Sequence, residues 1–171
     1  MNIDHISPGT PEQLNVIVEI PKGSQNKYEI DKKHGVFKLD RVLFSPLHYP
    51  GDYGFVPQTL GEDGDPLDAL VIVGIRTFPG CLIEARPIGV MRMLDSGQGD
   101  DKILCVPVSD PRMSHIKDIK QISKHVLEEI AHFFEVYKQL EGKKVKILGW
   151  KGAVVAKKKV REAIVRYKKE K

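Results

Sequence analysis

The segment 61–68, Gly-Glu-Asp-Gly-Asp-Pro-Leu-Asp, carries the residues best suited to chemistry in this chain. It places Asp63, Asp65 and Asp68 within six residues, directly before the apolar run 69–73. Three neighbouring carboxylates repel one another, and bound cations relieve that repulsion. Oxygen-only ligands select hard ions such as Mg²⁺, Mn²⁺ or Ca²⁺. The segment therefore predicts a divalent-metal site, while its Asp, Gly and Pro content also suits a solvated turn.

A second acidic segment, 94–102, contains Asp95, Asp100 and Asp101. Alone it fits a hairpin turn, but two acidic loops in one small domain favour a shared metal site. An EF-hand does not fit the first loop. With Asp63 as position 1, position 6 is Asp68 rather than Gly, and position 12 is Gly74 rather than Glu.

Basic and phenolic groups form a complementary set. Lys27 and Glu29 share one face of an alternating segment, Tyr49 and Tyr53 lie in a Pro- and Gly-containing turn, and Lys102 closes the second acidic loop. The others are Arg41, Tyr137 and Lys138. Arginine suits bidentate phosphate binding and lysine offers a point charge, so a metal-bridged phosphate ligand fits this set.

The elements that position these groups change in type along the chain. Apolar alternation bounded by Pro and Gly predicts strands at 15–20, 27–31, 36–44, 67–73, 82–94 and 103–108. A helix is predicted from Ser123, as its cap, to Gly142, with Leu140 in its apolar stripe, then a strand at 143–150. A second helix follows, with Ala156, Val160 and Ala163 on one stripe. The order predicts an α+β fold, a small antiparallel β-barrel with two helices in the C-terminal region.

Composition sets the class of protein. With 171 residues, 41% hydrophobic and 29% charged, the chain fits one soluble domain over 1–171. We expect no membrane span, since no apolar run approaches the ~20 residues that one needs. Two cysteines without metal spacing, and no secretory pattern at the amino terminus, predict a cytoplasmic protein.

Charge is unevenly distributed. Residues 143–171 hold 12 Lys/Arg against 2 acidic residues, whereas the first 142 residues hold 15 against 21. An OB-type nucleic-acid-binding barrel with a basic C-terminal helix is therefore an alternative. The acidic body and the lack of an aromatic stacking platform speak against it. A passive Ca²⁺-binding module is a third hypothesis.

The segment Asp63-Gly64-Asp65-Pro66-Leu67-Asp68 resembles the signature of the soluble family I inorganic pyrophosphatases, bacterial type. Further similar segments follow in family order, from Val16 to Trp150; they include Val18-Glu19-Ile20-Pro21, Lys27-Tyr28-Glu29-Ile30-Asp31, Asp40-Arg41, Asp52-Tyr53-Gly54 and Phe133-Phe134-Glu135-Val136-Tyr137-Lys138. The resemblance implies an OB-like barrel and Mg²⁺-dependent hydrolysis of pyrophosphate to two phosphates by a metal-activated water. It also implies a homohexamer, several Mg²⁺ ions with Mn²⁺ as a substitute, and no nucleic-acid or membrane partner.

The same resemblance assigns roles to residues. Asp65 is expected to be the base for the attacking water. The metal ligands are expected to be Asp63, Asp65, Asp68, Asp95, Asp100 and Glu19. The phosphate-binding residues are expected to be Lys27, Arg41, Tyr53, Lys102, Tyr137 and Lys138, with Glu29 and Tyr49 also at the site. Ser96 departs from the family, where Glu is expected.

Charge arithmetic on this set predicts a metal requirement. Six metal-binding carboxylates against Lys27, Arg41, Lys102 and Lys138 leave a net charge of about −2. Such a cavity repels a pyrophosphate anion, and two or more divalent ions reverse the sign.

Overall fold

The computed structural model describes residue 3 and residues 5–170. Its strands are β1 (Gly9–Thr10), β2 (Gln13–Ile20), β3 (Asn26–Asp31), β4 (Val36–Val42), β5 (Asp52–Phe55), β6 (Asp68–Val71), β7 (Leu82–Asp95), β8 (Gln98–Gly99), β9 (Lys102–Pro107) and β10 (Val145–Gly152). Its helices are α1 (Lys124–Val136) and α2 (Ala153–Glu170), with 3₁₀ turns η1 (Pro111–Met113), η2 (Ile119–Gln121) and η3 (Gln139–Glu141). Neither α1 nor α2 is long and apolar enough to cross a membrane.

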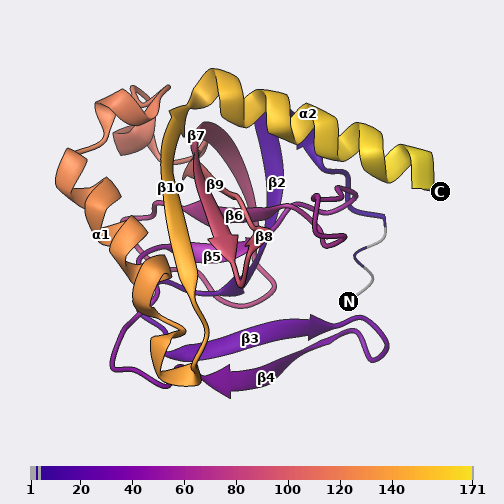
Figure 1. The fold of residues 1–171 in the computed structure, drawn as a ribbon. Helices are drawn as coiled ribbons and strands as arrows, with labels where there is room; N and C mark the ends of the chain where they lie inside the picture. Colours follow the sequence, from indigo (N-terminus) through magenta and orange to yellow (C-terminus); the bar gives the residue numbers. More distant parts are fainter. Residues whose placement is uncertain (1–2, 4, 171) are drawn as a thin grey trace.

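Among the described strands, five close into a ring. β2 pairs with β5, β5 with β6, β6 with β9, β9 with β7, and β7 returns to β2. Figure 1 shows this barrel in the middle of the molecule, with α1 on one side and α2 across one end. The predicted small OB-like α+β fold is confirmed. One pairing departs from the antiparallel arrangement, since β6 and β9 run parallel with Ala69 opposite Ile103.

The long strand β7 holds the barrel together because it pairs with four of the described strands, including the short β8 through Leu94 and Asp95. Its first residues pair with β2, its middle with β9, and its second half with β10. The β7–β9 register shifts between Pro87 and Gly89, where the strand bends. A Cβ at Gly89 would lie 2.1 Å from Ile119 Cγ2, so glycine permits this close approach.

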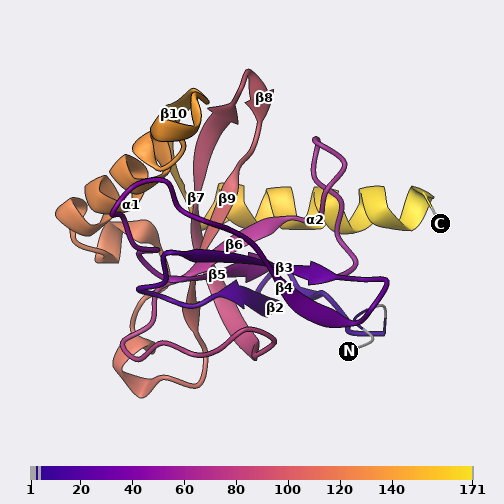
Figure 2. The ribbon, with the colours of Figure 1, turned by 90° about the horizontal axis from the view of Figure 1, so that it is seen from below.

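Strands β3 and β4 form a separate two-stranded sheet, below the barrel in Figure 1. Lys27 pairs with Arg41, and a register shift follows at Tyr28. The view from below in Figure 2 shows this hairpin crossing the barrel strands. It forms a wall facing the barrel, and it carries three of the predicted site residues, Lys27 and Glu29 on β3 and Arg41 on β4.

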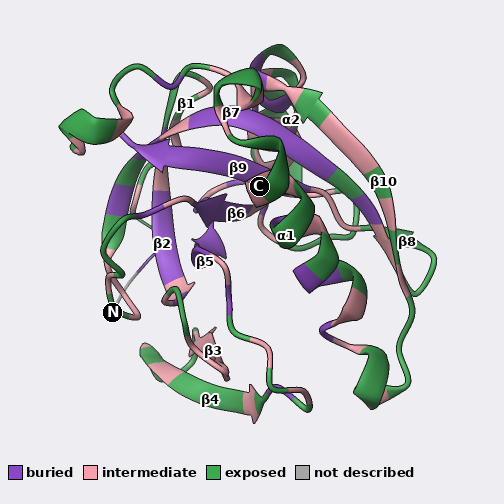
Figure 3. Cartoon of the chain, turned by 90° about the vertical axis from the view of Figure 1, so that its left-hand side faces the viewer, coloured by how far each residue is buried: buried purple, intermediate pink, exposed green. Residues whose placement is uncertain are grey.

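The core has two main parts. One fills the barrel and its α2 side, where Ala156, Val160 and Ala163 pack with barrel residues such as Val16 and Ile103. The other lies under α1 and includes Leu104, Met91 and Phe134. Figure 3 shows buried β2, β7 and β9 beside the more exposed outer surfaces of α1 and β4. Of these strands, β7 ends at the second acidic loop and β9 begins directly after it.

The predicted α2 stripe is confirmed, but the first helix is shorter than predicted. α1 ends at Val136, and the turn η3 follows before Gly142, whose φ is 73°. Leu140 is therefore 67% exposed instead of lying on a buried stripe. Ser123 occupies the N-cap position of α1, without a side-chain capping hydrogen bond.

The predicted turn around Tyr53 is instead the buried strand β5. Gly54 lies within this strand. The position requires glycine, because a Cβ there would lie 1.9 Å from the Ile17 carbonyl oxygen of β2. A glycine that suggests a turn in the sequence thus marks a close approach of two strands. The predicted strands at 15–20, 27–31, 36–44, 67–73, 82–94 and 103–108 correspond to β2, β3, β4, β6, β7 and β9.

Candidate active site

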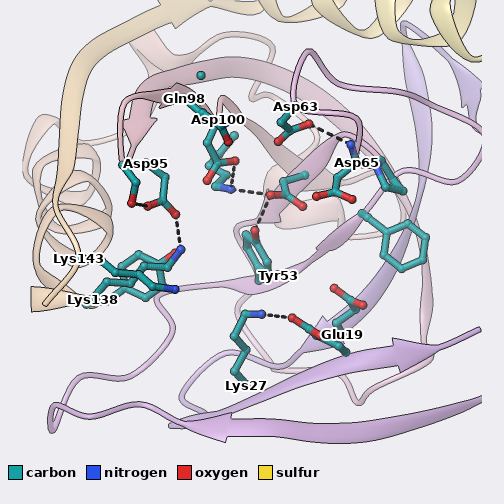
Figure 4. Close-up of a pocket in the computed structure, with 18 of the residues that line it drawn as sticks. Glu19, Lys27, Tyr53, Asp63, Asp65, Asp95, Gln98, Asp100, Lys138 and Lys143 are labelled. Carbon is teal, nitrogen blue, oxygen red and sulfur yellow. Dashed lines mark hydrogen bonds and ion pairs between the residues drawn. The ribbon is translucent and has the colours of Figure 1, made fainter. Parts of the chain in front are cut away.

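A cavity of about 610 Å³ opens between the barrel, the β3–β4 hairpin and the end of α1. Most of the predicted site residues line it. They are Glu19, Lys27, Glu29, Tyr53, Asp63, Asp65, Asp68, Asp95, Asp100, Lys102, Tyr137 and Lys138. Figure 4 shows the labelled carboxylates and lysines facing one another across this space. Residues far apart in the chain therefore converge, as the two-loop prediction required.

The first acidic loop, residues 61–68, is held by its own backbone. The Asp65 N–H donates to Asp63 Oδ1 over 3.1 Å, and the Gly61 N–H donates to the Asp65 carbonyl over 2.7 Å. Gly64 sits at φ 90°, a conformation that glycine adopts at little cost. The loop therefore presents both exposed aspartates to the cavity before Asp68 begins β6.

Lys102 lies at the centre of the carboxylates. Its side chain is 4% exposed, and its Nζ is 2.5 Å from Asp68 Oδ2 and in contact with Asp100 Oδ1. Burial disfavours the charged ammonium, but the Asp68 and Asp100 carboxylates outweigh burial and raise the pKa of Lys102. Burial and the neighbouring Asp68 raise the pKa of Asp100, although Lys102 opposes this. The Asp68 and Asp100 carboxylates thus share the one buried ammonium group of Lys102.

The opposite wall carries Glu19 and the β3 pair. Burial is the largest cause that raises the pKa of Glu19 to about 7, with Asp68 adding to it. The Ile30 N–H donates to Glu19 Oε1 over 3.0 Å, and this hydrogen bond lowers the pKa of Glu19 against the effect of burial. Lys27 forms an ion pair with Glu29 on the same strand face, as the alternation predicted.

The third wall is the end of α1. Lys138 pairs with Asp95, and this ion pair holds the pKa of Asp95 below its usual value despite burial. Tyr137 is 5% exposed and packs against Phe133, with ring centroids 5.2 Å apart. Tyr137 therefore serves the apolar core of α1 and lines the cavity as well.

Tyr53 donates from its hydroxyl to Asp68 Oδ2 over 2.7 Å. Burial raises its pKa well above the usual value, so the phenol keeps its proton. Its ring lies 5.5 Å from that of Tyr49 and 6.0 Å from that of Phe134. This aromatic contact couples β5 to α1 and fixes the position of the hydroxyl.

Two predicted site residues lie outside the cavity lining. Tyr49 is 2% exposed and packs against Phe133, so it supports the site from the core. Arg41 donates from Nε to Glu141 Oε1 over 2.9 Å and from Nη1 to Asp40 Oδ2 over 2.6 Å. These two carboxylates take two of the five N–H donors of its guanidinium.

Sequence reasoning missed several cavity residues. Lys143 was counted with the basic C-terminal segment, but the turn after Gly142 brings it to the rim. Lys32 follows β3, and Gln98 starts β8. Ser96 also lines the cavity; its hydroxyl donates to Asp95 Oδ1 over 3.1 Å, and Ser96 and Gly97 both have positive φ. Only the tertiary position of these loops identifies such residues.

The donor set suits hard divalent cations. Among the residues described, seven carboxylates and five lysines line the cavity, a formal net charge of −2. This net charge equals the predicted one, but the residues that produce it differ. Arg41 does not line the cavity, whereas Glu29, Lys32 and Lys143 do. Within residues 3 and 5–170, no three His, Cys, Asp or Glu side chains form a closed cation-binding group. Lys102 instead pairs with Asp68 and Asp100, and Lys138 pairs with Asp95.

Comparison with known proteins gives a consistent result. Residues 16–168 match the family model described as inorganic pyrophosphatase. The chain is 52% identical over 158 residues to the inorganic pyrophosphatase of Halalkalibacterium halodurans, covering 92% of this chain and 97% of that one. The chain is 55% identical over 157 residues to the inorganic pyrophosphatase of Streptomyces coelicolor, covering 91% of this chain and 96% of that one. The crystal structure of the Thermus thermophilus inorganic pyrophosphatase superposes with a TM-score of 0.95 at 46% identity, covering 98% of this chain and 99% of that one. The chain, whose acidic loops meet in one cavity, belongs to the inorganic pyrophosphatase family.

Proposed function

We propose that the 610 Å³ cavity is the site at which this enzyme hydrolyses pyrophosphate to two phosphates, with Mg²⁺ as the metal. The family membership makes the chain an inorganic pyrophosphatase, and that family is metal-dependent. The observation that carries the assignment of the site is the convergence of both acidic loops on one lysine-lined cavity.

The proposed metal ligands are carboxylates, which match the oxygen preference of Mg²⁺. They are Asp63, Asp65, Asp68, Asp95, Asp100 and Glu19. Bound divalent ions would neutralise the cavity, act as Lewis acids and lower the pKa of water. Glu19, with its pKa raised to about 7, must give up its proton to serve as a ligand.

Asp65 is our candidate for the general base. Among the described residues, no lysine or arginine lies within ion-pair distance of its carboxylate, whereas Asp68, Asp95 and Asp100 each contact a lysine. Asp65 can therefore accept a proton from a water molecule in the cavity. As the water oxygen bonds to one phosphorus, in line with the bridging oxygen, the bond from that phosphorus to the bridge breaks. The departing phosphate leaves with the electron pair of that bond.

The basic side chains are suited to hold the phosphates. Lys27, Lys102 and Lys138 surround the cavity, and Tyr53 and Tyr137 add hydroxyls. Lys32 and Lys143 extend this set at the rim. Arg41 uses two of its five N–H donors on Asp40 and Glu141, and we assign its other donors a part in phosphate binding. Fixed positive charges of this kind stabilise the charge that develops on the leaving phosphate.

A phosphate-release assay tests the assignment. The purified protein with excess Mg²⁺ should release two phosphates per pyrophosphate, and a chelator should abolish the release. Asp65→Asn should lower turnover far more than Mg²⁺ affinity. Glu62→Gln, in the same loop but outside the main cavity lining, is the matched control and should stay near wild type. No release by the wild type with excess Mg²⁺ would refute the function, and unchanged turnover of Asp65→Asn would refute the role of Asp65.

The remaining expectations from the family resemblance belong to this proposal. We propose one domain over 1–171, a homohexameric assembly, Mn²⁺ as a substitute ion and a cytoplasmic location. The two free thiols, Cys81 and Cys105, are compatible with a reducing compartment. Size-exclusion chromatography with light scattering would measure the assembly.

The nucleic-acid-binding alternative is not supported, because the whole barrel matches the inorganic pyrophosphatase family. The passive Ca²⁺ module differs from an enzyme in releasing no phosphate, so phosphate release in the same assay excludes it.

A further inference from the structure

The basic helix α2 lies outside the catalytic assignment above, yet one of its lysines is not solvated. The side chain of Lys159 is 23% exposed, and its Nζ lies 2.5 Å from Asp101 Oδ2. Its neighbour Lys158 is 73% exposed and faces Glu162 of the same helix at 3.8 Å. Lys159 therefore has a specific partner in the second acidic loop, residues 95–101.

We propose that Lys159 is a positioning residue that fixes the second acidic loop through Asp101, so that Asp100 faces the cavity. The proposal rests on the function given above, in which Asp100 is a metal ligand. It gives the C-terminal helix a part in metal binding without any contact between that helix and the metal.

Asp101 is held on both of its oxygens. Oδ1 accepts from the Met93 N–H of β7 over 3.3 Å, and Oδ2 meets Lys159 at 2.5 Å, with Arg92 Nε farther away at 3.9 Å. The Asp100 N–H also donates to the Met93 carbonyl, over 3.0 Å. Asp101 thus links β7 to α2 at the residue next to Asp100. The two side chains are separated by this arrangement, since Asp101 does not line the main cavity.

A second cavity, of about 120 Å³, lies where α2 meets both acidic loops. Asp63, Asp68 and Asp100 line it as well as the main cavity, and Lys159 and Arg166 line it from α2. Figures 1 and 2 agree in placing α2 across the end of the barrel.

Arg166 makes a comparable link to Leu60, the residue directly before the first acidic loop. Its Nη1 donates to the Leu60 carbonyl over 2.5 Å, and the Leu60 N–H donates to the Ala163 carbonyl over 3.1 Å. The helix can act as a rigid support because Ala156, Val160 and Ala163 anchor it in the core. One helix therefore holds both loops that carry the proposed metal ligands.

The direction in which metal affinity changes when Lys159 is replaced distinguishes a positioning role from a simple effect of its charge. Removing the positive charge of Lys159 makes the surroundings of Asp100 more negative, which by itself would strengthen cation binding. Loss of positioning would weaken it, because partners that orient metal ligands typically contribute about 10- to 100-fold in metal affinity.

The test is a titration of the substrate-free protein with Mn²⁺, followed by electron paramagnetic resonance, alongside phosphate release. Lys159→Met should raise the Mn²⁺ dissociation constant by about 10-fold. Lys159→Arg, which keeps the charge, should restore affinity to near wild type. Lys158→Met is the matched control on the same helix and should match the wild type.

Asp101→Asn tests whether Lys159 affects metal binding through Asp101. It should weaken Mn²⁺ binding about as much as Lys159→Met, and the double variant should be no weaker than either single variant. If Lys159→Met is misfolded by circular dichroism, the comparison of Lys159→Gln with wild type decides, because that variant removes the same positive charge and leaves every carboxylate in place.

Failure of the Lys159 proposal can be told apart from failure of the proposed function. A wild type that neither binds Mn²⁺ nor releases phosphate overturns both proposals. A functional wild type with unchanged or tighter Mn²⁺ binding in Lys159→Met overturns only the positioning role. The same follows if Asp101→Asn binds Mn²⁺ as wild type does, or if the double variant loses a further 10-fold.

Discussion

Lys102 Nζ lies 2.5 Å from Asp68 Oδ2 where the parallel strands β6 and β9 begin. The pairing of Ala69 with Ile103 places the preceding residues, Asp68 and Lys102, side by side at the cavity. Lys102 also contacts Asp100, so one buried ammonium compensates two carboxylates. This relation makes the stability of the site depend on what neutralises these acids.

Replacing Lys102 with Met should therefore destabilise the protein most when metal is absent. Removing one partner of a buried ion pair costs about 3–5 kcal/mol, because the remaining charge is left without compensation. Thermal unfolding in a chelator should show the loss, and excess Mg²⁺ should recover part of it by neutralising Asp68 and Asp100. Lys146→Met, at an exposed position of β10, is the control. Equal destabilisation with and without Mg²⁺ would contradict this view of the site.

Arg41→Lys should lower turnover although the positive charge is kept. Arg41 reaches Glu141 with Nε and Asp40 with Nη1, and a lysine cannot reproduce this two-sided contact. We expect a decrease of roughly 10-fold in kcat/KM, equivalent to about 1.4 kcal/mol. The measurement is steady-state phosphate release, with the exposed Arg76→Lys as control. Unchanged kinetics would remove Arg41 from the functional set.

Gly54→Ala should be strongly destabilising. A Cβ at this position would lie 1.9 Å from the Ile17 carbonyl oxygen, so β2 and β5 would have to separate. Overpacking of this kind costs about 3 kcal/mol. Urea unfolding would measure the loss against Gly99→Ala, where the nearest atom to a new Cβ is 3.9 Å away. Equal midpoints for the two variants would show that the strands adapt without cost.

Asp118 should make the stability depend on acid pH. Its carboxylate accepts from the Ala153 N–H at the start of α2 over 2.8 Å and from the Lys120 N–H over 3.1 Å. These hydrogen bonds hold the pKa of Asp118 below its usual value. A carboxyl whose pKa is lower in the folded state stabilises the protein above its unfolded pKa, and this contribution is lost as pH falls through the folded pKa.

Asp118→Ala should therefore unfold more easily than wild type at pH 7, by about 1 kcal/mol, as for other helix-capping residues. The difference should begin to shrink near pH 4, the usual pKa of an unfolded aspartate, and should be lost as pH falls through the lower pKa of the folded state. Chemical unfolding at several pH values measures this. Glu128→Gln, on the exposed side of α1, is the control, and a difference that does not change with pH would refute the explanation.

The sequence alone determined much of the fold and most of the site. Strong alternation predicts β2 and β3, and helical spacing predicts the α2 stripe, because these patterns depend on local geometry. Similarly, the density of Asp63, Asp65 and Asp68 indicates a cation site, since so many carboxylates within one short loop must be neutralised. The resemblance added residues distant in the chain, such as Glu19 and Lys138, which line the same cavity.

Only the tertiary structure decided how these groups are paired. The parallel β6–β9 contact, which places Lys102 beside Asp68, depends on a chain crossover that no local pattern encodes. Arg41 is drawn to Glu141 and Lys159 to Asp101 by contacts between segments far apart in the chain. Gly54, read locally, indicates a turn, whereas the approach of β2 makes it a strand residue. Local sequence governs backbone preference, but ion pairs and close approaches form only once the folded chain has placed both partners.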